Sequence, residues 1–333
     1  MISQKRLCSL IDIIRARAGE DLTYFEFSTV LAFVHFYLEG VDMAVIEVGL
    51  GGRLDATNLV TPEVSVITNV SLEHTEYLGG NINAIAREKG GIIKRNGICV
   101  TAATQPSVID VLENICLKKE AKLFRYGRDM KIRKKKGGKI FYYGIEKTYG
   151  NLNLPLIGRH QVKNASLALA VVEALAFGGL NIDDNSIFEG MSDVKWEGRL
   201  EILSHDPRIV VDGAHNPAGI SALCNSLTTD FSYDRLICIF GVLSDKDYKG
   251  MLRRLAGIAH HIILTSLQMS RASKIDELDR VVEKLGVSYE CIPETSMALE
   301  RARSLAGKND LICITGSIYL VGETKKSYRF NLL

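Results

Sequence analysis

The sequence predicts an α/β protein with two domains, of which the second is a doubly wound sheet of largely parallel strands. Its 333 residues are enough for two domains that each have a hydrophobic core. Beyond Arg199, short apolar runs alternate with helical segments, and this order predicts parallel strands joined by one helix per crossover. We therefore place a domain boundary near Gly198, with one domain over residues 1–198 and the other over residues 199–333.

Each predicted element of the second domain is recognised from its apolar pattern. The strand-like runs are almost continuously apolar, which is typical of parallel strands that are covered on both faces. The predicted strands are 208–212, 235–240, 260–264, 288–292 and 310–315, and the predicted helices begin near Pro217, Asp247, Lys274 and Ser296. In open sheets of this kind ligands bind beyond the carboxyl ends of the strands, so the loops there are candidate binding sites.

The first domain combines helical spacing with shorter strand-like runs. Thr23 followed by Glu26 is the signature of a capping box, and Gly40 is a typical stop signal for the same helix. The run 43–48 is apolar at most positions and predicts a short strand that is buried on both faces. The predicted elements are helices over 1–17, 23–38, 81–89 and 160–177, strands over 43–48, 64–70 and 97–102, and a hairpin of 131–136 with 139–144.

Composition and charge argue against several classes of protein. Charged residues make up 24% and hydrophobic residues 47%, and a net charge of +2 favours neither a nucleic acid nor a membrane as partner. No apolar run approaches the roughly 20 residues of a membrane-spanning helix, and no signal peptide is recognisable. The seven cysteines include no C-x-x-C pair, which argues against a disulfide framework or a zinc site. We expect a cytoplasmic, monomeric protein.

The most informative stretch is the glycine-rich run 47–58, which reads Glu-Val-Gly-Leu-Gly-Gly-Arg-Leu-Asp-Ala-Thr-Asn. It begins at the end of the predicted strand 43–48, where an open sheet exposes its binding edge. Glycine lets the backbone approach a ligand closely, and a carboxylate such as that of Glu47 is a hard oxygen ligand suited to magnesium. The alternative is a structural turn in which Arg53 and Asp55 pair with each other.

Seven further segments accompany the glycine-rich run in a characteristic order. They are 22–26, 72–79, 85–92, 158–165, 196–200, 212–217 and 316–323. With these eight segments the sequence resembles the folylpolyglutamate synthase and dihydrofolate synthase branch of the Mur ligase superfamily, over about residues 21–323. The resemblance implies an incomplete Mur-ligase-type ATPase domain, followed by a Rossmann-like, doubly wound C-terminal domain of the glutamate-ligase type.

The resemblance implies an ATP-dependent ligase that joins L-glutamate to a folate-type carboxylate, with ATP and Mg²⁺ as cofactors. In this family the acceptor carboxylate attacks the γ-phosphate of ATP, and the amino group of glutamate then displaces phosphate from the acyl phosphate. Such a reaction gathers negative oxygens at one point, so it requires cations and hydrogen-bond donors around them. The residues leave open whether the acceptor is dihydropteroate, a folate or both, and how many glutamates are added.

The matching segments carry over the family's functional residues one by one. Glu47 and His74 correspond to magnesium ligands, and Lys89 corresponds to a carbamylated lysine that acts as a further, carboxylate-like ligand and as a catalytic residue. His215 corresponds to a second catalytic residue, close to the γ-phosphate. The expected nucleotide contacts are Asn164, Arg199, Asp212 and His215, and the expected pterin contacts are Thr23, Tyr24, Phe25, Glu26, Leu54, Asp55 and Ala56.

Several of these residues also have a purely structural interpretation. A hydrogen bond within its loop would explain His74, and a favourable charge at the end of a helix would explain Lys89. Thr23 and Glu26 cap a helix whether or not they touch a ligand. Asn164, considered by itself, is a surface or buried structural amide.

The phosphate loop with which this family opens is not recognisable. Neither G-x-x-x-x-G-K-[ST] nor Gly-Lys-Gly-Ser occurs in the 333 residues. Because that loop donates backbone hydrogen bonds to the triphosphate, we expect a fragment that lacks the N-terminal segment and binds ATP weakly. Three interpretations follow: a folate-adding ligase, a peptidoglycan ligase of the Mur type, or an inactive remnant that binds folate or nucleotide. The segment 23–26 and the glycine-rich run favour the first.

Overall fold

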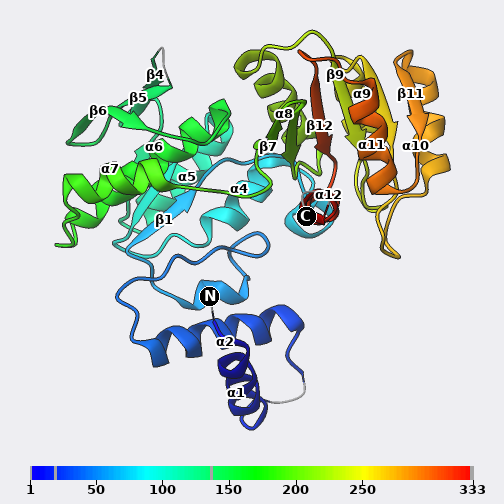
Figure 1. Ribbon diagram of the computed structural model, residues 1–333. Coiled ribbons are helices and arrows are strands. Elements are labelled where there is room, and N and C mark those ends of the chain that lie inside the picture. The colour runs from blue at the N-terminus through cyan, green and yellow to red at the C-terminus, as the bar shows by residue number, and fades with distance from the viewer. Residues whose placement is uncertain (1, 19–20, 136–137, 331–333) are drawn as a thin grey trace. The chain divides into compact units, whose positions relative to one another are not determined.

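The structure is a computed structural model that describes residues 2–18, 21–135 and 138–330 (Figure 1). These residues form two compact units, neither of which is one continuous piece of chain. Unit 1 comprises Met1–Lys131, Tyr143–Lys147 and Ser166–Ile182, and unit 2 comprises Ile132–Tyr142, Thr148–Ala165 and Asp183–Leu333. The division at residue 198 therefore stays a prediction.

Unit 1 is built around a short parallel sheet with the strand order β1-β2-β3. Its strands are β1 (Val64–Ile67), β2 (Ile98–Thr101) and β3 (Lys122–Arg125), and its helical segments before β4 are α1 (Gln4–Arg15), α2 (Tyr24–Glu39), η1 (Ala56–Leu59), α3 (Thr75–Leu78), α4 (Ile82–Gly90) and α5 (Pro106–Lys118). Ile85 of α4 and Leu112 of α5 are buried in one apolar cluster with Cys99 of β2. Helices α4 and α5 thus supply the apolar cover that a parallel sheet requires.

The strand predicted over residues 43–48 is wrong. This segment belongs to no strand, and Val45 is 94% exposed. Apolar residues become a strand only where a neighbouring strand supplies hydrogen-bond partners for the backbone. In the described part of unit 1, the edge strand β1 pairs with β2 alone, so no strand pairs with the segment 43–48.

A second small sheet has the order β4-β5-β6 and includes the predicted hairpin. It consists of β4 (Lys131–Lys134), β5 (Lys139–Tyr143) and β6 (Thr148–Asn153), and is followed by α6 (Arg159–Ala176) and α7 (Asp184–Asp193). Lys136 and Gly137 at the predicted tip lie outside the described residues, as does Met1 of the first predicted helix. The ring of Tyr149 on β6 stacks on that of Tyr142, with centroids 6.2 Å apart.

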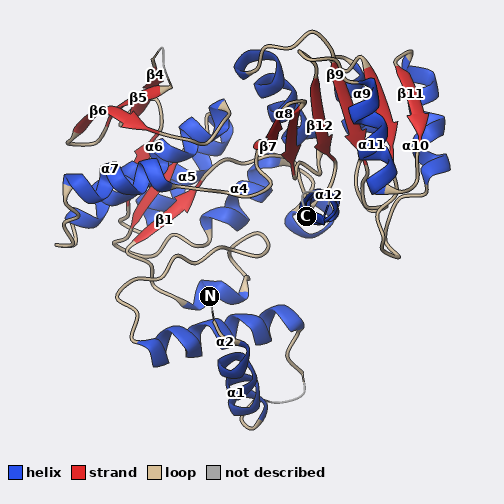
Figure 2. Ribbon diagram, in the orientation of Figure 1, coloured by secondary structure: helices blue, strands red, loops and turns tan. Residues whose placement is uncertain are grey.

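Unit 2 contains a six-stranded sheet with the order β11-β10-β9-β12-β8-β7 (Figure 2). The five predicted strands are confirmed as a parallel set, and β7 is added to it as an antiparallel edge strand. The strands are β7 (Glu201–His205), β8 (Arg208–Asp212), β9 (Leu236–Phe240), β10 (His261–Leu264), β11 (Ser288–Cys291) and β12 (Leu311–Thr315). The sequence did not predict β7, because its residues are only half-buried and do not form an apolar run.

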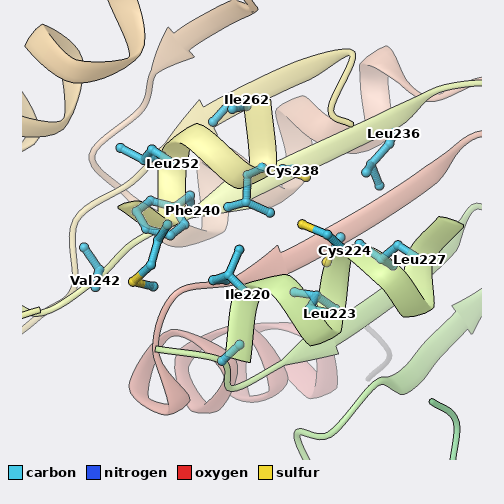
Figure 3. Packing of buried hydrophobic residues seen from close by; sticks show 14 of the residues in the cluster. Ile220, Leu223, Cys224, Leu227, Leu236, Cys238, Phe240, Val242, Leu252 and Ile262 are labelled. Atoms are coloured by element: carbon cyan, nitrogen blue, oxygen red, sulfur yellow. The ribbon is translucent and has the colours of Figure 1, made fainter. Parts of the chain in front are cut away.

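Helices cover both faces of this sheet, as its doubly wound topology requires. The helices are α8 (Pro217–Asp230), α9 (Tyr248–Ala256), α10 (Ile275–Val282) with η2 (Glu283–Leu285), α11 (Thr295–Leu305) and α12 (Ile318–Phe330). Figure 3 shows Cys238 and Phe240 of β9 in one apolar cluster with Ile220 of α8. Ile239, from the opposite face of β9, packs in a second cluster with Leu299 of α11. All residues of β9 are therefore buried.

Across the described ranges, none of the helices is both long enough and apolar enough to cross a bilayer.

Candidate functional site

The glycine-rich run forms a loop in unit 1 that touches two helices. Gly52 has φ +154°, and a Cβ there would lie 2.9 Å from the carbonyl oxygen of Glu88 and 3.1 Å from that of Lys89, both on α4. A Cβ at Gly49 would lie 2.3 Å from the ring of Phe25 on α2. Because these positions carry no side chain, the loop packs against Phe25 and against the end of α4 that holds Lys89.

The carboxylate of Asp55 organises this loop from within. One oxygen accepts a hydrogen bond from the Leu50 N–H at 2.8 Å, and the other accepts bonds from the N–H and hydroxyl of Thr57. The guanidinium of Arg53 pairs instead with Glu88, at 3.1 Å. The Arg53–Asp55 pair of the alternative, purely structural interpretation is therefore wrong, since each residue is engaged elsewhere.

The other residues predicted to contact the pterin lie at the start of α2 or in the loop itself, and they differ in exposure. Thr23 and Glu26 form the predicted capping box at the start of α2, where the Glu26 N–H donates to the Thr23 hydroxyl and the Thr23 N–H donates to the Glu26 carboxylate. The bonds from Thr23 lower the pKa of Glu26. Tyr24 is 90% exposed and Leu54 is 80% exposed, whereas Ala56 is half-buried. The structural role of the capping pair is confirmed, and the pterin contacts stay a prediction.

Two of the three predicted magnesium-binding segments meet in unit 1. The ammonium of Lys89 lies 3.2 Å from the carboxylate of Glu73, the residue before His74. His74 itself is exposed and has φ 48°, a left-handed conformation that is strained for a residue with a side chain and is often found at functional sites. Glu47, the first residue of the glycine-rich run, is exposed and belongs to no helix or strand.

The donor types fit magnesium, but the three ligands stay a prediction. A carboxylate and a carbamylated lysine would offer the hard oxygen atoms that this ion prefers. Within the ranges that the structure describes, no group of three or more His, Cys, Asp and Glu side chains is arranged to hold a metal ion. Lys89 in its cationic form is balanced by Glu73, so it could become a ligand only after its charge is reversed.

In unit 2, the predicted nucleotide contacts gather at the carboxyl end of β8. The carboxylate of Asp212 accepts hydrogen bonds from the Leu200 N–H at 3.0 Å and from the Ala214 N–H at 2.9 Å. The guanidinium of Arg199 lies against Gly213, with Nη1 2.9 Å from where a Cβ of that glycine would be. Burial raises the pKa of Asp212, although the two N–H groups and Arg199 oppose that rise.

His160 belongs to the same region and was not predicted as a site residue. Burial lowers the pKa of His160, while the charge of Asp212 opposes this shift and the charge of Arg199 adds to it. Gly158 has φ +106° and its missing side chain leaves room for the His160 ring, 2.6 Å from the Cβ position. We call His160, Arg199 and Asp212 the Asp212 cluster. The one feature of the sequence that could have indicated a functional role for His160 was its position inside the segment 158–165.

The other two predicted nucleotide contacts are exposed. The His215 Nδ1 lies 2.9 Å from the carbonyl oxygen of Gly213, so the imidazole ring is tied to its own loop. The Asn164 amide donates to Gln161, one turn earlier in α6, at 3.3 Å. Their contact with a nucleotide stays a prediction.

Comparison with known proteins identifies the class to which this fold and these sites belong. The Mur ligase middle domain matches residues 5–172, and the Mur ligase glutamate ligase domain matches residues 198–318. The chain therefore belongs to the Mur ligase family, within the group of dihydrofolate synthases and folylpolyglutamate synthases.

Curated relatives carry the names of that group. The dihydrofolate synthase/folylpolyglutamate synthase of Bacillus subtilis is 34% identical over 311 residues, which are 91% of this chain and 72% of the relative. A probable bifunctional folylpolyglutamate synthase/dihydropteroate synthase of Haloferax volcanii is 33% identical, over 94% of this chain and 38% of the relative. The chain thus spans part of the length of each.

Solved structures of the same group share the fold. Mycobacterium tuberculosis folylpolyglutamate synthase, complexed with ADP and AMPPCP, has a TM-score of 0.89 and 32% identity over 98% of this chain and 79% of that chain. E. coli FolC in complex with DHPP and ADP has a TM-score of 0.90 and 28% identity, over 100% of this chain and 77% of that chain.

The packing of the glycine-rich loop leads to a prediction about Gly52. Gly52→Ala should lower the free energy of unfolding by about 2–4 kcal/mol, because the methyl group would meet two backbone carbonyls and the backbone would be strained. Gly80→Ala is the control, since no atom lies within 4 Å of its Cβ position. Urea unfolding measures the free energy of unfolding of both variants. Equal losses of stability would contradict the close approach of Gly52 to the carbonyl groups of α4.

The half-buried position of His160 leads to a prediction about pH. Because its pKa is lowered from the usual 6.5, unfolded chains take up a proton at His160 before folded chains do. The stability present above that pH is therefore lost as the pH falls toward the folded pKa, by at most about 1.4 kcal/mol per pH unit. His160→Gln should reduce this loss in urea unfolding. The same change at the exposed His205 is the control, and an unaltered pH dependence in His160→Gln would refute the assignment.

Proposed function

We propose that this chain is an ATP-dependent ligase that joins L-glutamate to the carboxylate of dihydropteroate or of a folate through an acyl phosphate. The observation that carries the proposal is the glycine-rich loop, which packs against Phe25 on one side and against the end of α4 on the other. A flat aromatic surface and a candidate metal-binding lysine thus lie beside one loop. A ligase that activates a pterin-linked carboxylate requires both.

The acceptor would bind along α2 and the glycine-rich loop. Tyr24 offers an exposed aromatic ring on which a pterin can stack, and Phe25 lies against Gly49. Leu54 and Ala56 of the loop would complete the apolar contact. Asp55 and the capping pair Thr23 and Glu26 are engaged within the protein, so we assign to them the shape of this surface.

Magnesium, when bound, would neutralise the oxygens that gather around the transferred phosphoryl group. We assign Glu47 and His74 as its ligands, with Lys89 as a third ligand after carbamylation. Carbamylation would place a second negative charge beside Glu73, which now lies 3.2 Å from the ammonium. Two negative groups so close together repel each other unless a cation lies between them, so carbamylation of Lys89 would require the metal ion.

The nucleotide would bind at the carboxyl edge of the sheet in unit 2. Arg199 supplies a positive charge beside Gly213, and the bonds that Asp212 accepts hold the loop that leads to His215. We assign Arg199 and Asn164 to direct nucleotide contact, and His215 to the γ-phosphate as a catalytic residue. Asp212 would shape this edge through the backbone.

The names of the relatives favour a ligase of the folate group over the two other interpretations. B. subtilis and E. coli proteins named dihydrofolate synthase/folylpolyglutamate synthase are 34% and 31% identical to the chain. A peptidoglycan ligase does not bind a pterin, so it would not require the proposed pterin surface around Phe25.

Incorporation of labelled L-glutamate tests the proposed reaction. The purified chain should incorporate glutamate only when ATP, Mg²⁺ and either dihydropteroate or tetrahydrofolate are all present. Because no phosphate-loop pattern occurs in the sequence, we expect slow turnover. Equal incorporation with a muramyl peptide would refute the folate assignment. Binding of dihydropteroate without any incorporation would point to the remnant.

The exposed ring of Tyr24 allows a test of the pterin surface that leaves folding intact. Tyr24→Ala should weaken dihydropteroate binding by about tenfold, the loss of one aromatic contact, and should change stability by less than about 0.5 kcal/mol. Tyr37→Ala is the matched control, because Tyr37 is 84% exposed near the other end of α2. Calorimetric titration measures the affinity of both variants for dihydropteroate. Equal affinities would contradict a pterin site at the start of α2.

A further inference from the structure

A half-buried lysine on α12 pairs with two carboxylates close in sequence to Arg199. The ammonium of Lys325 lies 2.7 Å from one oxygen of Glu201 and 3.0 Å from the other, and 2.7 Å from Glu197. Only 14% of the Lys325 side chain is exposed. Burial alone would lower the pKa of Lys325, but its bonds to Glu197 and Glu201 raise it above the usual value, so the lysine stays charged.

Glu201 also contacts the backbone next to Arg199. Its carboxylate accepts a hydrogen bond from the N–H of Gly198 at 2.7 Å. On the other side of Arg199, the N–H of Leu200 donates to Asp212 at 3.0 Å. Arg199 is thus flanked by two peptide N–H groups, each held by a separate carboxylate.

The backbone on both sides of Arg199 requires such support. Gly198 has φ +70° and Leu200 has φ +47°, and for leucine this left-handed conformation is strained. Strained conformations persist only where the surroundings hold them. The carbonyl of Gly198 also accepts a bond from the N–H of Gly213 at 2.8 Å, beside the Arg199 guanidinium. The turn that presents Arg199 is therefore anchored at three peptide groups.

From this chain of contacts we infer that Lys325 and Glu201 are positioning residues for nucleotide binding. Lys325 orients the Glu201 carboxylate, and this carboxylate holds the Gly198 N–H and thereby the turn that directs Arg199 toward the nucleotide. Neither residue touches the nucleotide itself. The inference rests on the nucleotide-binding role of Arg199 proposed above. The purely structural alternative is that the ion pair only attaches α12 to β7.

Titration with AMPPCP and Mg²⁺ separates these roles. Lys325→Met and Glu201→Gln should each weaken AMPPCP binding by about tenfold, because a charged hydrogen bond is lost, whereas Lys325→Arg should restore most of the affinity. Lys326→Met is the matched control, since its side chain is exposed at the next position of α12, and it should bind like the wild type. Thermal unfolding of every variant shows that each one is folded.

The decisive comparison combines Lys325→Met with Arg199→Ala. If Lys325 acts through Arg199, the double variant binds AMPPCP no more weakly than Arg199→Ala alone. An additive loss in the double variant would overturn the positioning role, as would wild-type affinity in both Lys325→Met and Glu201→Gln when Arg199→Ala is weakened. Wild-type affinity in Arg199→Ala, or a wild type without AMPPCP binding, would instead overturn the proposed nucleotide site and this inference with it.

Discussion

The binding edge of unit 2 depends on two hydrogen bonds that the carboxylate of Asp212 accepts. Asp212 stands at the end of β8, is only 6% exposed, and gives one oxygen to the N–H of Leu200 and the other to the N–H of Ala214. One buried group thereby joins the turn that carries Arg199 to the loop that carries His215. Burial of a charge is costly unless it is hydrogen-bonded, so these two bonds make the position tolerable. Loss of either bond would leave one buried carboxylate oxygen without that partner and would weaken the connection between the turn and the loop.

The candidate site of unit 1 depends on glycines, whose lack of a side chain lets backbone segments approach closely, and not on a buried charge. Gly49 and Gly52 allow a loop to touch Phe25 on α2 and the backbone of α4 at distances that no Cβ could occupy. The loop is then held by Asp55 from within and by the pair of Arg53 with Glu88 from outside. Close approach of backbone groups, rather than a network of buried charges, sets the relative positions of its segments.

Much of the fold could be predicted because unit 2 is built from strong local patterns. A run such as 236–240 is buried at every position, and the same uninterrupted apolarity is visible in the sequence. The prediction failed at 43–48, since apolarity reports a tendency to be buried and does not report the presence of a neighbouring strand. It also failed at β7, whose half-buried residues carry no apolar pattern. Of the site, Arg199 and Asp212 were predicted, but the proximity of His160 was not.

The sequence by itself determined the alternation of strands and helices, the capping box of α2, the glycines of the loop and the family to which the chain belongs. These depend on residues that are adjacent or a few positions apart, so they are encoded locally. Only the tertiary structure decided that Lys89 faces Glu73, that Arg53 pairs with Glu88 rather than Asp55, and that Lys325 reaches Glu201 from 124 positions away. Such contacts depend on how the helices pack on their sheets. The sequence shows that a residue is charged, but it does not show which residue will lie beside it after packing.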